Sequence, residues 1–144
     1  MNINYIKLKP NAIIPTRATE LSAGYDLYAC IEQSIEIPPY KTVKIGTGLA
    51  ITPPKCCFGA IFARSGLACN KGLSPANCTG VVDGDYTGEY IVALYNDSNE
   101  TRTIEPNDRI AQLVFIPFIH GDFVEVENLE KTNRGSGGFG SSGK

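Results

Sequence analysis

Three short polar segments carry residue types that suit phosphate chemistry. In the first, Arg64-Ser65-Gly66, a cation and a hydroxyl stand where a short helix is expected to begin. Free backbone N–H groups at a helix start favour phosphate, and a guanidinium beside them would complete a phosphate site. An ordinary capped helix on the surface would contain the same residues. The segment by itself therefore leaves both interpretations open.

The second segment, Asp83-Gly84-Asp85-Tyr86, follows the apolar pair Val81-Val82. Asp-Gly is typical of a tight hairpin turn whose acids are solvated. The alternative is a pocket rim, where an ionised carboxylate takes a proton from water and the tyrosine ring covers a sugar. The segment alone does not decide between a turn and a rim.

The third segment is a Gly/Ser-rich tail that runs from Gly135 to Gly143 and contains Phe139. Such a composition usually marks a frayed chain end. It also allows backbone amides to approach phosphate closely, and Phe139 would offer a stacking face. The preceding Arg134 favours a loop that orders on a ligand, although no Gly-Lys-Ser/Thr follows and the tail is no P-loop.

Two further polar residues interrupt apolar strand patterns. Asp26 lies within Ala23–Leu27, and Gln112 lies within Arg109–Leu113. A polar group at such a position needs a partner. Asp26 is either a buried structural acid or an outer-shell magnesium ligand, and the partner of Gln112 is either protein or phosphate.

Composition excludes several other functions. The chain has 144 residues, a net charge of -2 and 42% hydrophobic residues, which predicts one globular domain and disfavours a nucleic-acid binder. No apolar stretch is long enough to span a bilayer or to act as a signal peptide. The single histidine, His120, disfavours zinc and triad chemistry and is expected in a loop or at a strand edge. Free thiols in a reducing cytosol are expected at the five cysteines, which are Cys30, Cys56, Cys57, Cys69 and Cys78.

Short strands must position these segments. Apolar residues alternate with polar or small ones over 43–51, 90–95 and 124–127, and Pro and Asn-Asp turns separate the runs. This pattern predicts an all-β fold, which could be a β-sandwich, a jelly roll or a barrel.

One segment, residues 65–72, breaks this strand pattern and is expected to form a short helix. Ser65 is placed to cap its start, and Lys71 suits its last turn. Gly72 suits the left-handed residue that ends a helix.

Taken together, the motifs resemble those of the homotrimeric dUTP diphosphatase (dUTPase) family. Five segments match the family's five motifs in order, over essentially the whole chain. They are Ala23–Tyr28, Arg64–Ala68, Gly80–Glu89, Asp108–Leu113 and Arg134–Gly143.

The resemblance implies a distorted jelly-roll or β-barrel subunit with one short helix and a flexible C-terminal arm. Residues 1–133 would form the domain, and residues 134–144 would form an arm that closes the active site of a neighbouring subunit. It also implies a homotrimer with shared sites and hydrolysis of dUTP to dUMP and diphosphate with Mg²⁺. This reaction keeps uracil out of DNA and supplies dUMP for thymidylate synthesis. A cytoplasmic location is expected, or the host cytoplasm for a phage or viral protein.

The same resemblance implies a role for each matching residue. Asp83 would activate the water that attacks the α-phosphate, and Asp26 would meet magnesium through water. The third motif is expected to form a hairpin that holds uracil through its backbone. The residues that would bind substrate are Arg64, Ser65, Gly66, Asn77, Gly80, Val81, Val82, Tyr86, Ile91, Gln112, Arg134, Phe139, Gly140 and Ser141.

Few positions depart from the family pattern. Ala63 stands where a proline often precedes the Arg-Ser-Gly motif. Cys56, Cys57, Cys69 and Cys78 have no family role and are interpreted as small core or interface residues. Two alternatives to the dUTPase remain at this point: a dCTP deaminase-like enzyme of the same fold, and a nucleotide-dependent regulatory binder.

Overall fold

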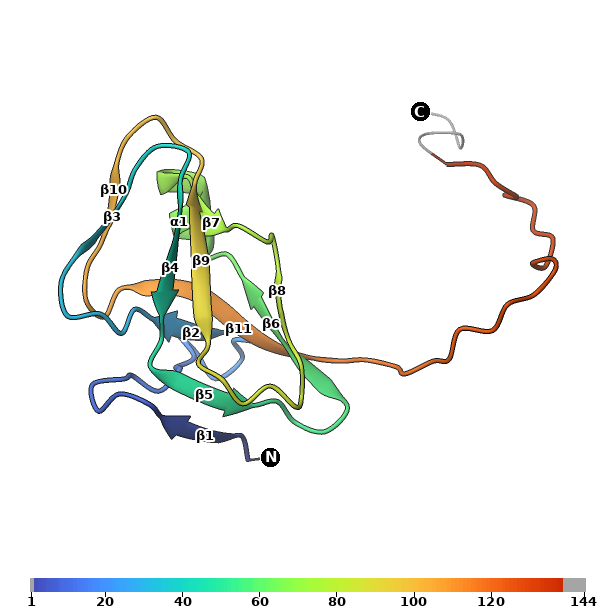
Figure 1. Ribbon diagram of the computed structural model, residues 1–144, viewed down its shortest axis with the longest axis horizontal. Coiled ribbons are helices and arrows are strands. Elements are labelled where there is room, and N and C mark those ends of the chain that lie inside the picture. Colours follow the sequence, from blue (N-terminus) through green and yellow to red (C-terminus); the bar gives the residue numbers. More distant parts are fainter. Residues whose placement is uncertain (1, 139–144) are drawn as a thin grey trace.

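Short antiparallel strands make up almost all of the body, as the alternating pattern predicts (Figure 1). The protein is represented by a computed structural model that describes residues 2–138. The elements in chain order are β1 (Asn4–Lys7), β2 (Tyr25–Tyr28), β3 (Ile35–Ile37), β4 (Thr42–Gly46), β5 (Leu49–Thr52), β6 (Cys57–Phe62), α1 (Ser65–Lys71), β7 (Leu73–Pro75), β8 (Gly80–Val82), β9 (Ile91–Asn96), β10 (Arg102–Ile104) and β11 (Arg109–Pro117).

The strands of the described chain form four separate sheets, and none of them closes into a barrel. The largest has the order β2-β11-β6-β8, and the second has the order β4-β9-β7. Two-stranded sheets join β1 with β5 and β10 with β3. The long strand β11 therefore pairs with β2 on one side and β6 on the other, which places the first and fourth sequence motifs side by side in one sheet, and the second motif begins just after β6.

Inward-facing residues of the alternating strands form the core. In β9, Val92 and Leu94 are buried while their neighbours in sequence are more exposed. The run expected over 43–51 is divided into two strands at Gly48, which has a φ of 68°. A Cβ there would lie 2.7 Å from the Cys30 sulfur, so glycine is required at this bend.

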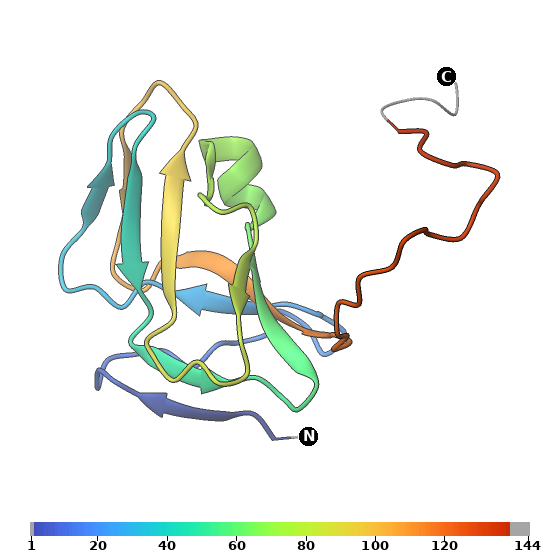
Figure 2. The ribbon, with the colours of Figure 1, turned by 45° about the vertical axis from the view of Figure 1, so that its right-hand side comes forward.

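The predicted helix is present as α1 and lies beside β7 (Figure 2). Lys71 lies in its last turn, and Gly72 ends it with a φ of 66°, as expected. The expectation that Ser65 caps the helix is wrong. Arg64 is the N-cap residue with extended backbone angles, and Ser65 already belongs to the first turn, so its side chain makes no capping hydrogen bond.

After β11 the chain leaves the body as a long extended segment, which starts at residue 118 and leads to the predicted arm (Figure 1). The strand expected at residues 124–127 is not formed, because no described strand of the same chain lies beside this segment. Apolar side chains of the segment face solvent in the single subunit: Ile119, Phe123, Val124 and Leu129 are all at least 78% exposed. A segment with an alternating pattern forms a strand only where another strand is available for pairing.

The cysteine and histidine predictions have mixed outcomes. All five cysteines are unpaired in the structure, and free thiols in a reducing cytosol stay a prediction. Cys56, Cys69 and Cys78 are exposed, so the core interpretation is wrong for these three, and the interface interpretation stays a prediction. His120 lies outside the strands, as expected, with its ring centre 4.6 Å from that of Phe118.

Among residues 2–138, the structure has no helix with the length and hydropathy of a membrane span.

Candidate active site

A pocket of about 230 Å³ lies where β8 ends and β9 begins. It collects seven of the residues predicted from the third motif and its surroundings, and three that were not predicted. Its lining residues are Ile61, Asn77, Gly80, Val81, Val82, Asp83, Tyr86, Glu89, Tyr90 and Ile91.

The backbone around this pocket differs from the expected hairpin. The strand β8 pairs with β6, and β9 pairs with β4 and β7, so β8 and β9 are not ladder partners. A turn follows β8 and is closed by the Tyr86 N–H, which donates to the Asp83 carbonyl at 3.2 Å. The segment between the two strands therefore crosses from one sheet to another. The Asp-Gly pair predicted the turn correctly, but the strands that flank it diverge.

This divergence leaves backbone groups free at the pocket. The strand β8 is at the edge of its sheet and has a neighbour on one side only. The strand β7 pairs with Leu94–Asn96, so the first residues of β9 have no strand on that side. Edge strands present unpaired N–H and C=O groups in a fixed array. Such an array can hydrogen-bond a planar polar ligand that enters between the two strands.

Side chains fix the rim of the pocket. Asp83 is exposed and comes directly after β8. The Tyr86 hydroxyl donates to the Glu89 carbonyl at 3.0 Å, which folds its ring back over Gly88. A Cβ at Gly88 would lie 2.5 Å from that hydroxyl, so a larger residue there would displace the Tyr86 ring. The Glu89 carboxylate accepts the Gly48 N–H at 2.7 Å and ties the rim to the bend before β5.

A second group of functional side chains lies at the start of α1. The Arg64 Nε donates to Asp26 Oδ1 at 2.9 Å, and Arg109 Nη1 donates to Asp26 Oδ2 at 3.3 Å. The Asp26 side chain is only 6% exposed, whereas those of Arg64 and Arg109 are 23% and 51% exposed. Gln112 is the ladder partner of Asp26. Arg64 Nη1 also donates to the Arg109 carbonyl at 3.2 Å. Two guanidinium groups around one carboxylate leave a site with a net positive charge.

These contacts bear on the alternatives that the sequence left open for Asp26. A buried carboxylate that accepts from two arginines fulfils the structural role. Residues 2–138 contain no group of three or more His, Cys, Asp or Glu side chains that could hold a metal ion. The contact of Asp26 with magnesium through water stays a prediction. A Cβ at Gly66 would meet nothing within 4 Å, so the space above the helix start is open.

The structure does not bring the two groups together within one chain. The residues that line the pocket include neither Arg64, Ser65 and Gly66 nor Gln112. Arg134 lies on the arm, where its Nε donates to the Gly137 carbonyl at 2.9 Å. The predicted residues Phe139, Gly140 and Ser141 lie outside the described residues.

Sequence reasoning missed four residues of these two groups. Ile61, Glu89 and Tyr90 line the pocket, and Arg109 shares Asp26 with Arg64. Arg109 and Glu89 lie inside two of the five motif segments. Their charge could have marked them as candidate site residues. Nothing in the sequence marks Tyr90, which fits the strand pattern as an ordinary core aromatic.

The Tyr90 side chain is unusual in its burial. It is 1% exposed, and its hydroxyl is the one buried side-chain polar atom of residues 2–138 that has no hydrogen-bond partner. Burial, with a smaller contribution from the nearby Tyr86, raises the pKa of Tyr90 to about 12. The hydroxyl therefore stays protonated at neutral pH.

An edge-strand pocket beside an acidic turn suits a planar polar group, and the separate pair of arginines suits an anion. Comparison with known protein families identifies the class of protein. The dUTPase family model matches residues 10–143, and the chain belongs to this family.

Curated relatives support the assignment. A deoxyuridine 5'-triphosphate nucleotidohydrolase of Desulfitobacterium hafniense is 46% identical over 144 residues, which cover 99% of this chain and 95% of that protein. The protein of the same name from Acinetobacter baumannii is 44% identical over 132 residues, or 91% of this chain and 88% of its own length.

Solved structures agree on the fold. A mutant dUTPase of Staphylococcus bacteriophage 80alpha with dUpNHpp has a TM-score of 0.88 at 27% identity, with 99% of both chains covered. A mutant dUTPase of phage phi11 of S. aureus, described with a structural Mg(II) ion, has a TM-score of 0.82 at 23% identity and covers 91% of this chain and 100% of its own. The expected jelly-roll-like β subunit is confirmed, without closure into a barrel.

Proposed function

We propose that the protein hydrolyses dUTP to dUMP and diphosphate. The observation that carries this proposal is the pocket, which gathers Asn77, Gly80–Asp83, Tyr86 and Ile91 around one cavity. Membership of the dUTPase family agrees with it and does not favour the dCTP deaminase alternative.

Uracil would enter between the edge of β8 and the start of β9. The free backbone groups there supply donors and acceptors at fixed positions, and Asn77 adds an amide. A pocket built from backbone groups rejects cytosine, because the reversed donor and acceptor pattern of cytosine leaves buried groups unpaired. It also leaves no room for the methyl group of thymine. The Tyr86 ring would lie under the deoxyribose and exclude a 2′-hydroxyl.

Asp83 would act as the general base. Its carboxylate would take a proton from a water molecule while the water oxygen attacks the α-phosphorus. The bond from that phosphorus to the bridging oxygen breaks, and diphosphate leaves with the electron pair. General-base assistance of this kind typically contributes about 10²- to 10⁴-fold to the rate. Its place directly after an edge strand supports this role, because β8 fixes the backbone that carries the carboxylate.

Arg64, Ser65 and Gly66 would hold the phosphates, with help from Gln112. The open space at Gly66 and the Ser65 side chain that makes no cap support this role. Arg109 extends the positive site, because its guanidinium shares Asp26 with that of Arg64. Phosphoryl transfer depends mainly on positioning and on charge neutralisation, and fixed guanidinium groups supply both.

We also propose a homotrimer whose active sites are shared between subunits. The pocket and the arginine pair are separate groups in one chain, and apolar side chains between residues 119 and 129 are exposed in that chain. Both features are accounted for if residues from different subunits meet. Residues 1–133 would form the domain, and the arm of residues 134–144 would close over a neighbouring site. Phe139, Gly140 and Ser141 would reach the nucleotide there, with Phe139 stacked on uracil and Arg134 near the phosphates.

Magnesium would arrive with the triphosphate, because this ion prefers phosphate oxygens and water to all-protein cages. When bound, it would neutralise charge on the phosphate oxygens. Asp26 can meet only its water shell, because Arg64 and Arg109 already occupy the carboxylate. A cytoplasmic location agrees with five unpaired cysteines.

The test is diphosphate release from dUTP, dTTP, dCTP and UTP, with ammonia release from dCTP measured in parallel. We expect turnover of dUTP alone and no ammonia. Sedimentation of the same sample is expected to show three subunits. Ammonia release or equal turnover of the four nucleotides would refute the proposed substrate, and a monomer that turns over dUTP would refute the shared site.

A further inference from the structure

The strand β11 contains one residue more than its partner β2 over the segment that carries the fourth motif. Gln112 pairs with Asp26, whereas Arg109 pairs with Tyr28, so three residue steps on β11 match two steps on β2. Such an extra residue is a β-bulge, and bulges are common at sheet edges, where β2 lies, and beside active sites. The proposed function does not yet account for this bulge.

The bulge changes the face of the sheet on which Arg109 lies. Side chains alternate between the two faces of a regular strand, so residues 109 and 112 would lie on opposite faces. Ile110 and Ala111 are instead buried one after the other. The extra residue thus brings Arg109 to the face that Gln112 and Asp26 share, where its Nη1 donates to Asp26 Oδ2 at 3.3 Å.

The side chain of Arg64 is held at two of its nitrogens. Its Nε donates to Asp26 Oδ1 at 2.9 Å, and its Nη1 donates to the Arg109 carbonyl at 3.2 Å. Because the guanidinium group is planar, two anchored nitrogens fix its orientation. A cation that is held in place before the ligand binds loses less conformational freedom on binding than a mobile one. These contacts therefore prepare Arg64 to bind an anion.

Arg109 completes the hydrogen bonding of Asp26. The Asp26 side chain is only 6% exposed, and among the described residues Arg109 is the one donor to its Oδ2 atom. A buried carboxylate oxygen that loses its partner is unfavourable. Without the Arg109 guanidinium, the carboxylate is free to rotate toward another partner, and its hold on Arg64 is weakened.

We propose that Arg109 is a positioning residue of the phosphate site. The bulge places Arg109 so that it holds the Asp26 carboxylate, and this carboxylate in turn holds Arg64 in the orientation that binds the phosphates. Arg109 acts through Arg64 and not through a phosphate contact of its own. This inference rests on the proposed function, because that function assigns the phosphates to Arg64.

The test is Arg109→Gln, which removes the charge and keeps a polar side chain. The measurements are the Kd for dUpNHpp and the Kd for deoxyuridine, which has no phosphate. The first is expected to rise by about 5- to 10-fold, between the contribution of an exposed ion pair and that of a hydrogen bond to a charged group. The second is expected to stay within about twofold of the wild type, because a merely structural effect would move both. Arg109→Lys keeps the charge and should give an intermediate Kd for dUpNHpp.

A double-mutant cycle with Asp26→Asn separates positioning from a direct phosphate contact. If Arg109 acts through Asp26, Arg109→Gln should raise the Kd for dUpNHpp by less than about twofold once Asp26 is already replaced. An equal effect in both backgrounds would show that Arg109 binds the phosphates itself, which would overturn the inference.

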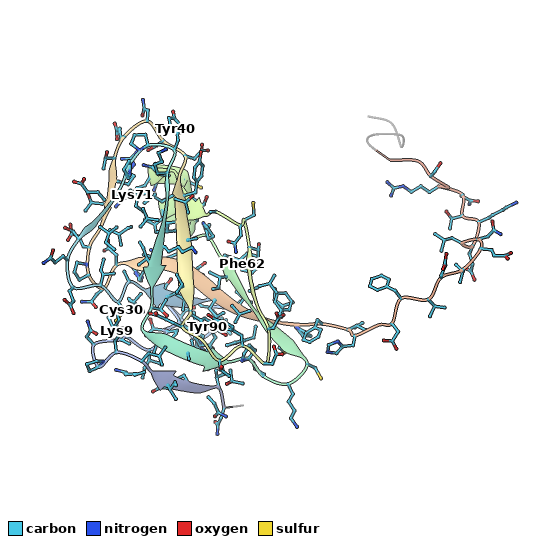
Figure 3. The ribbon with its side chains drawn as sticks, in the orientation of Figure 1. Lys9, Cys30, Tyr40, Phe62, Lys71 and Tyr90 are labelled. Carbon is cyan, nitrogen blue, oxygen red and sulfur yellow. The ribbon has the colours of Figure 1, made fainter. Side chains whose placement is uncertain are left out.

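Arg102→Gln is the matched control. Arg102 also pairs with one carboxylate, that of Glu100 at 2.8 Å, and its Nε donates to the Lys71 carbonyl at 2.9 Å. Figure 3 shows Lys71 in the upper part of the body, apart from Phe62, which is the ladder partner of Gln112. The control therefore removes a similar set of contacts away from the phosphate site, and it should change neither Kd.

Three other outcomes also overturn the inference. If the wild type hydrolyses dUTP and Arg109→Gln binds dUpNHpp as the wild type does, Arg109 has no part in phosphate binding and the proposed function stands. If Arg109→Gln weakens the binding of dUpNHpp and deoxyuridine equally, Arg109 supports the fold and not the phosphate site. If the wild type neither binds dUpNHpp nor hydrolyses dUTP, the proposed function fails together with the inference.

Discussion

Replacing Asp26 with asparagine tests how the phosphate site is held. The substitution keeps the size of the side chain but removes the charge that faces two guanidinium groups, at 2.9 Å from Arg64 and 3.3 Å from Arg109. Breaking a buried ion pair costs about 3–5 kcal/mol. Water screens part of this loss because both arginines are partly exposed, so we expect about 2–4 kcal/mol less stability. For a chain of this size that is a fall of about 5–15 °C in melting temperature.

The assay is thermal unfolding at one fixed protein concentration, followed by the KM for dUTP. Arg64 loses its anchor in the variant, so the KM should rise at least about tenfold, equivalent to about 1.4 kcal/mol. Glu100→Gln is the matched control. Glu100 also pairs with an arginine, Arg102, at 2.8 Å, but its side chain is 68% exposed, and we expect a loss of about 0–1 kcal/mol. If Asp26→Asn is as stable as this control and keeps the wild-type KM, Asp26 does not hold the phosphate site.

Three further predictions concern the base, the arm and the buried tyrosine. Asp83→Asn should keep the Kd for dUpNHpp and lower diphosphate release by about 10²-fold or more, since it removes the general base; a variant with retained turnover would exclude Asp83 as the base. Deletion of residues 134–144 should leave a folded trimer by sedimentation with little diphosphate release, whereas an unfolded or fully active product would contradict the role of the arm. The pKa of Tyr90 is raised to about 12 by burial, so the unfolded chain releases this proton first as the pH rises above 10. Wild-type stability in urea should therefore fall between pH 10 and 12 more steeply than that of Tyr90→Phe, and parallel curves would refute the assigned pKa.

The all-β fold could be predicted because apolar residues recur at every second position of the sequence, and the buried residues of the strands follow the same period. In β9, the buried residues Val92 and Leu94 alternate with more exposed neighbours, as the sequence suggests. The same pattern failed at residues 124–127, where Val124 is 78% exposed. An alternating pattern shows which face of a segment is apolar. A strand also needs a neighbouring strand to pair with, and the sequence of the segment does not show whether that strand exists.

The third motif shows the same limit at the candidate site. Asp83-Gly84 predicts a turn, and the turn is present. The sequence does not reveal that β8 and β9 join different sheets, because pairing with β6 and β4 is decided by residues far away in the chain. The divergence of β8 and β9 opens the pocket and leaves backbone groups at the strand edges unpaired. The feature that matters most for ligand binding therefore depends on contacts between residues far apart in the sequence. Tyr90 was missed for a related reason, since only the folded structure shows that its hydroxyl has no partner.

The arginine pair gives the clearest physical argument for a site shared between subunits. Arg64 and Arg109 carry two positive charges against the single negative charge of Asp26, and both arginine side chains are partly exposed. The Asp83 carboxylate lines a different cavity that contains neither arginine. Hydrolysis needs a base and fixed positive charge at one phosphorus atom, so we propose that these two parts meet on one nucleotide where subunits join. Mixing Asp83→Asn with Arg64→Ala subunits should therefore restore dUTP turnover in the mixed trimers, because some sites would combine an intact Asp83 with an intact Arg64. Two variants that stay inactive after mixing, in trimers shown to contain both chains, would refute the shared site.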